Sequence, residues 1–128
     1  MTYYYSRILD ASYDEAIDRA TEELKKEGFG ILTEIDVKTT LKQKLDVDFR
    51  PYRILGACNP ALAYKALQTE DKIGTMLPCN VIVQHLEDGR SEVAAIDPVA
   101  SMMAVDNPAL ADIAHQVRDK LRQVIERL

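Results

Sequence analysis

The stretch that decides the fold is residues 78–96, PCNVIVQHLEDGRSEVAAI. Its first part, Pro78 to Val83, is apolar on both sides of a predicted strand, which is typical of a central strand. Asp88-Gly89 then supplies the positive φ that a tight hairpin turn needs, and Ser91 to Ile96 is predicted to return as the antiparallel partner. A hairpin here favours an antiparallel or mixed sheet over a doubly wound parallel one.

Upstream of the hairpin, strands and helices are predicted to alternate. Thr2 to Leu9 is rich in tyrosine and β-forming residues and is predicted to be a strand near a sheet edge. A capping box at Ser12 and Glu15 begins a helix over 13–27, which Gly28 ends. The other predicted elements are a strand over 29–35, a helix after Asp36 with Val37, Leu41 and Leu45 on one face, a strand over 52–57, a helix from Asn59-Pro60, and a short turn or helix over 71–77.

Downstream of the hairpin, a short Ala/Met/Val segment spans residues 99–105. Asn107-Pro108 then predicts the start of a last helix, because asparagine caps helices and proline needs no amide partner at the first position. Apolar residues at helical spacing continue from Leu110 to Leu128. The whole pattern predicts one α+β domain over residues 1–128, a two-layer sandwich with helices packed on a mostly antiparallel or mixed β-sheet.

The composition narrows the class of protein. The 128 residues are 47% hydrophobic and 29% charged, with a formal net charge of −5, so the chain can bury a core and repels phosphate backbones and anionic lipids. We therefore expect no nucleic-acid or membrane partner. The amino-terminal residues lack the pattern of a signal peptide, so a cytoplasmic location is expected, with both cysteines as reduced thiols.

The two cysteines of the chain are each followed by asparagine, and each Cys-Asn pair adjoins a proline: Cys58-Asn59-Pro60 and Pro78-Cys79-Asn80. Cys58 is predicted to end a strand just before a capped helix. The unpaired amides at that helix end stabilise a thiolate and attract anions. Asn80 is predicted to lie in a strand, where asparagine is disfavoured, so it requires a hydrogen-bond partner or a ligand.

The same residues also have a purely structural interpretation. Free cysteine often serves as a small buried hydrophobe, and Asn59 is explained as a helix cap. Zinc requires four ligands, and only His85 and His115 could join the two thiols, at spacings unlike a zinc motif. We therefore predict no metal site and assign no cofactor.

A basic segment precedes Cys58. Five cations between Asp36 and Arg53 outnumber three carboxylates, so Lys44 and Arg53 are candidates to hold an anion near Cys58. The alternative is an exposed helix face with ordinary ion pairs, which contribute little to stability.

Several segments together resemble the family called domain of unknown function 302, and the resemblance spans nearly the whole chain. The resemblance implies a compact, stand-alone and dimeric α+β domain, and it implies no activity and no catalytic residue. The segments that carry it are Gly28-Phe29-Gly30, Glu34-Ile35-Asp36, the Lys44 segment, residues 54–63, Gly74, Leu77-Pro78-Cys79-Asn80-Val81 and Ile96-Asp97-Pro98.

Three functional hypotheses follow. The first is a homodimeric domain that binds a small molecule or an anion through Cys58, Asn59, Cys79 and Asn80, with help from Lys44 or Arg53. The second is a thiol enzyme or carrier, with Cys58 as candidate nucleophile and Cys79 as its supporting thiol. The third is a structural or interaction module in which both Cys-Asn pairs only pack and cap. All three depend on whether the two cysteines meet at a shared hollow.

Overall fold

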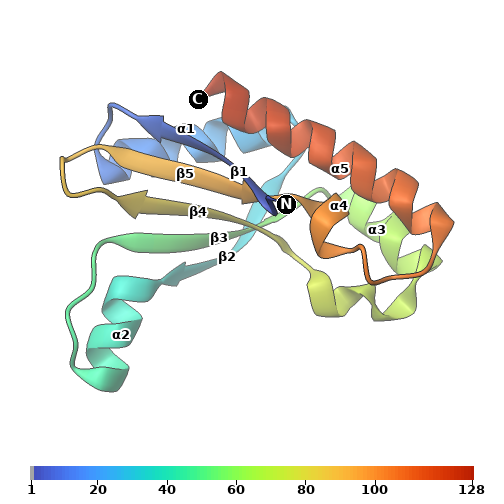
Figure 1. The fold of residues 1–128 in the computed structure, drawn as a ribbon, viewed down its shortest axis with the longest axis horizontal. Helices are drawn as coiled ribbons and strands as arrows, with labels where there is room; N and C mark the ends of the chain where they lie inside the picture. The colour runs from blue at the N-terminus through green and yellow to red at the C-terminus, as the bar shows by residue number, and fades with distance from the viewer. Residues whose placement is uncertain (1) are drawn as a thin grey trace.

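The computed structural model describes residues 2–128; the predicted 1–128 domain begins at Met1, which lies outside these described residues. Strands and helices alternate until the final hairpin and helices (Figure 1). The elements are β1 (Tyr4–Leu9), α1 (Tyr13–Lys26), β2 (Gly30–Asp36), α2 (Val37–Leu45), β3 (Tyr52–Cys58), α3 (Pro60–Thr69), the 3₁₀ helix η1 (Asp71–Met76), β4 (Cys79–His85), β5 (Ser91–Ile96), α4 (Pro98–Ser101) and α5 (Pro108–Arg127).

The five strands form one sheet in the order β1-β5-β4-β3-β2, and every neighbouring pair is antiparallel. β4 is the middle strand and β1 is an edge, as their sequences predict. The predicted hairpin joins β4 to β5 and pairs His85 with Ser91. β4 runs to His85, whose N–H donates to the Pro51 carbonyl at 2.9 Å. The predicted α+β sandwich is confirmed, with a fully antiparallel sheet.

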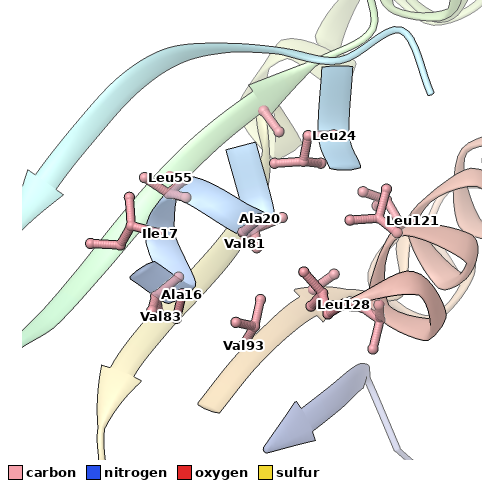
Figure 2. Close-up of a cluster of buried hydrophobic side chains, with 14 of the residues drawn as sticks. Ala16, Ile17, Ala20, Leu24, Leu55, Val81, Val83, Val93, Leu121 and Leu128 are labelled. Carbon is pink, nitrogen blue, oxygen red and sulfur yellow. The ribbon is translucent and has the colours of Figure 1, made fainter. Parts of the chain in front are cut away.

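The core lies between one face of this sheet and the helices α1 and α5. Figure 2 shows Ala20 of α1 close to Val81 of β4, and Leu121 of α5 facing the same layer. Complete burial of a leucine or valine side chain contributes roughly 1.5–3 kcal/mol, so this layer holds the fold together. The hydrophobic side chains without exposed surface are Ala16, Ala20, Leu24, Leu55, Val81, Val83, Val93, Ala95, Leu121 and Val124.

Four helix starts carry the side-chain caps that the sequence predicts. Ser12 Oγ accepts from the Glu15 N–H at 3.2 Å, and Asp36 Oδ1 accepts from the Thr39 N–H at 3.0 Å. The two Asn-Pro pairs do the same for α3 and α5. These bonds satisfy amides that would otherwise lack partners, which fixes where each helix begins.

α2 lies apart from the other long helices. Figure 1 shows it on the opposite side of the strands from α1 and α5. None of its residues is buried. Val37 and Leu41, on its predicted apolar face, are half-buried, and Leu45 is 67% exposed. Within residues 2–128, no helix has both the length and the apolar character that a membrane crossing requires.

Gly56 lies where two strands and a loop come closest together. A Cβ built at this position would overlap Thr33 Oγ1 on β2 and would stand 2.8 Å from Pro78 Cγ. In the register of β3 and β4, Gly56 pairs with Asn80. The absence of a side chain therefore lets β2, β3 and the entry to β4 approach one another beside the two cysteines.

We expect Gly56→Ala to lower the free energy of unfolding by about 1–3 kcal/mol, because overpacking forces backbone shifts. Urea denaturation measures this change. Gly30→Ala is the matched control on β2, since nothing lies within 4 Å of a Cβ there. Equal stability of the two variants would contradict the close approach at Gly56.

Candidate functional site

A pocket of about 290 Å³ opens where the sheet meets the helices α3, α4 and α5. These helices converge at one end of the strands (Figure 1). Among its lining residues only Asn59 and the two cysteines carry side chains other than hydrocarbon or thioether groups. The lining consists of Phe29, Leu32, Ala57, Cys58, Asn59, Leu62, Ala63, Leu67, Leu77, Pro78, Cys79, Pro98, Met102, Ile113, Ala114 and Val117.

The register of β3 and β4 brings the two cysteines together. Ala57 pairs directly with Cys79, and Cys58 is the next residue along β3. Cys58 therefore ends one strand beside the place where Cys79 begins its neighbour. Cys58 is half-buried, Cys79 is 9% exposed, and both line the same pocket. The shared hollow on which the sequence hypotheses depend is present.

The environment keeps Cys79 protonated. Burial and, to a smaller extent, charge repulsion from the neighbouring Cys58 raise the pKa of the Cys79 thiol to about 11. The described lining contains no histidine, carboxylate or amine that could accept a proton from either thiol. Cys79 is therefore a neutral, weakly polar group at neutral pH.

Asn59 joins three elements at the edge of the pocket. Its Oδ1 accepts from the Leu62 N–H, and its Nδ2 donates to the Glu27 carbonyl, both at 3.2 Å. Glu27 is the C-cap residue of α1. The following Gly28 has a φ of +83°, which glycine adopts without strain. The amide thus caps α3 and anchors the end of α1, so its polar atoms are already engaged.

Asn80 lies on the other side of the sheet. Successive residues of a strand point to opposite faces, so Cys79 points toward the helices and Asn80 away from them. Asn80 is exposed and lines a separate hollow of about 340 Å³ that also contains Tyr4 and Tyr52. The structure therefore does not bring the second asparagine to the cysteine pocket.

The two predicted cations also lie elsewhere. Arg53 is near the beginning of β3, and Cys58 ends the strand about 17 Å away. Arg53 Nη2 lies 3.6 Å from Asp36 Oδ2, and its guanidinium stands over the ring of Tyr13. Lys44 belongs to α2, beyond the same far end of β3. Neither cation faces the pocket.

The residues that sequence reasoning missed are the apolar ones. Leu62 and Ala63 come from α3, and Ile113 and Val117 come from α5. Their helical spacing predicts burial, but spacing cannot tell a filled core from a hollow one. Within residues 2–128, no three histidine, cysteine or acidic side chains gather closely enough to hold a metal ion.

Comparisons with other proteins agree with this fold. The sequence profile of the family described as Domain of unknown function DUF302 matches residues 5–128. A crystal structure described as an uncharacterized conserved protein DUF302 from Bacillus stearothermophilus is 30% identical, with a TM-score of 0.91. That match covers 99% of this chain and 98% of the other. No curated protein matches the chain. Both positive matches confirm the resemblance found in the sequence.

The raised pKa of Cys79 predicts that stability falls in alkaline solution. In an unfolded chain the Cys79 thiol would lose its proton near pH 9, whereas the folded protein retains it until about pH 11. The protonated Cys79 thiol therefore contributes fully to the free energy of unfolding below pH 9. This contribution is lost between pH 9 and 11, with a loss of about 2–3 kcal/mol.

Urea unfolding from pH 7 to 11 measures this loss. Cys79→Ala should lose less stability than the wild type over the same interval, because the titrating group is gone. Cys58→Ala serves as the control for removal of a thiol. Parallel profiles for wild type and Cys79→Ala would contradict the buried neutral thiol.

Proposed function

Because this chain belongs to the DUF302 family, whose description names no activity, we propose its function from the pocket itself: the protein binds a small, uncharged, apolar molecule beside Cys58 and Cys79. The observation that carries this proposal is a pocket of about 290 Å³ whose lining is almost entirely apolar. Ligand sites characteristically combine such walls with a few polar groups that orient the ligand.

The pocket's size suggests the kind of ligand. An apolar cavity of about 150 Å³ holds one benzene molecule, so this pocket suits a bicyclic ring system or a medium-length alkyl chain. At its rim, Leu32 is 68% exposed and Leu67 is 44% exposed. Exposed apolar residues at the mouth favour entry of an apolar ligand from water, because their own surface is also covered on binding.

The same pocket has few groups that could bind an anionic ligand. Anions bind helix ends through free N–H groups. At the start of α3, Pro60 has no N–H, the Leu62 N–H is bonded to the Asn59 side chain, and the Ala63 N–H is bonded to the Asn59 carbonyl. Ala61 alone remains of the first four, and the lining supplies no cation. We therefore favour an uncharged small molecule over an anion as the ligand of this pocket.

Thiol chemistry is the second candidate, because two free cysteines share one pocket. A cytoplasmic location would keep both reduced and available. A nucleophilic thiol, however, needs a neighbouring base or positive charge to activate it. The lining supplies neither, which favours a role for the two sulfurs as polarisable walls of the binding site.

Two fluorescent probes test the proposal. N-phenylnaphthylamine is neutral and joins a naphthalene to a phenyl ring through an amine, and anilinonaphthalene sulfonate has the same rings with one negative charge. We expect the neutral probe to bind at a single site and at least about tenfold more tightly than the sulfonate, since the lining has no cation to solvate the charge. A tighter sulfonate complex would contradict the preference for uncharged ligands.

Two alanines of α3 provide matched variants. Ala63 lines the pocket, whereas Ala61 is exposed on the same helix and outside it. Ala63→Phe should fill the space and weaken binding of the neutral probe at least about tenfold, while Ala61→Phe should leave it within about twofold. Equal binding by the two variants would place the probe elsewhere.

A third variant separates binding from thiol chemistry. Cys58→Ser removes the more accessible nucleophile and retains nearly the same volume, so probe affinity should change less than about threefold. Covalent labelling of the wild type by a ligand, absent in Cys58→Ser, would instead favour the thiol enzyme or carrier. Failure of every apolar probe to bind would leave the structural module as the function.

A further inference from the structure

Within residues 2–128, the face of the sheet opposite α1 and α5 carries no helix except α2, which contacts β2 and β3 (Figure 1). Antiparallel sheets that face water usually present polar side chains there. In this sheet the outward side chains include only one charged group, Glu92, although 29% of the chain is charged. The fourteen outward residues, from the alternation and register of the strands, are Tyr4, Ser6, Ile8, Thr33, Ile35, Tyr52, Ile54, Gly56, Asn80, Ile82, Gln84, Glu92, Ala94 and Ile96.

Large side chains on this open face remain in contact with solvent. Ile8 on β1 is 47% exposed, and Ile35 on β2, at the opposite edge, is 48% exposed. Tyr3 and Tyr4 are 64% and 42% exposed beside the hollow of about 340 Å³. Several exposed large apolar side chains on one face are typical of an interaction site.

The one charge on the open face is already satisfied. Glu92 Oε1 accepts from Gln84 Nε2 at 2.8 Å, and Gln84 Oε1 accepts from Arg50 Nε at 2.8 Å. This relay links the carboxylate to a cation, so covering the face would not leave an isolated buried charge. The polar groups at this end of the face are therefore compatible with burial.

A second unpartnered apolar surface belongs to residues 37–51, the arm formed by α2 and the loop after it. Leu45 and Val47 of the arm are 67% and 44% exposed. The arm carries four cations and two carboxylates, a net charge of +2, so the rest of the chain carries −7 of the total of −5. The arm of one molecule is therefore attracted electrostatically to the body of another.

We propose that a second copy of this chain covers the open face, with the arm of each molecule packed against the body of the other. The proposal goes beyond ligand binding in the cysteine pocket and involves a different surface. A two-fold arrangement matches each apolar face with its own copy and each positive arm with a negative body.

The area available fits a stable dimer. Five strands about 4.8 Å apart and about 20 Å long present a flat area of roughly 500 Å². A standard interface buries about 800 Å² on each partner and uses about 20–30 residues a side. The fourteen outward residues, Tyr3, and the arm's Val37, Leu41, Leu45, Val47 and Phe49 provide twenty, so face and arm together supply what the face alone lacks.

Light scattering on the full chain, over concentrations from about 1 to 100 µM, tests the proposal. We expect the wild type to have twice the mass of one chain. Ile8→Lys with Ile35→Lys places a cation at each edge of the open face, where strands tolerate lysine, and should raise the dissociation constant at least about 100-fold. The control, Tyr64→Lys with Met103→Lys, changes two apolar residues outside the face that are each 65% exposed, and it should remain dimeric.

Leu45→Lys tests the arm independently. Leu45 is mostly exposed on its own chain, so the folded monomer should tolerate lysine there. The dissociation constant of the dimer should rise at least about tenfold. Circular dichroism confirms that each variant is folded. A monomeric wild type would mean that a different partner covers the face, and would overturn the proposal. A dimer that persists in both the face variant and Leu45→Lys would assign the interface to another surface and would overturn it equally.

Discussion

The two-residue period of the antiparallel strands is the constraint on which the rest of the structure depends. Each strand must direct alternate side chains to opposite faces of the sheet. Leu55, Val81 and Val93 belong to the inward set and are completely buried. The outward set lies on the face that α1 and α5 do not cover. A shift of one residue in any strand would exchange the two sets, so the burial of the inward set fixes every register.

This period also divides the two Cys-Asn pairs. Cys79 points to the covered face and Asn80 to the open one, although they are neighbours in sequence. The pair at Cys58 and Asn59 avoids the same division because the strand ends there and a helix begins. The chain therefore has two distinct surfaces, an apolar pocket beside the thiols and an open face with tyrosines and amides. Each surface requires its own explanation.

Most elements could be predicted because their signals are local. The caps at Ser12 and Asp36, the Asn-Pro starts and the Asp88-Gly89 turn each depend on residues a few positions apart. The site was less predictable, because three of its six candidate residues lie away from the cysteines. Arg53 is close to Cys58 in sequence, but an extended strand carries it about 17 Å away. The apolar residues that line the pocket have the same sequence pattern as residues of a filled core, so the sequence could not identify them as a site.

By itself, the sequence determined most of the strands and helices and predicted a mostly antiparallel or mixed sheet. These properties follow from spacing, capping and composition. Only the tertiary structure decided that Cys58 and Cys79 share a pocket, that Asn80 does not, and that one face of the sheet lies open. Those outcomes depend on strand register and on which face the helices cover, and both are set by packing among residues far apart in the chain.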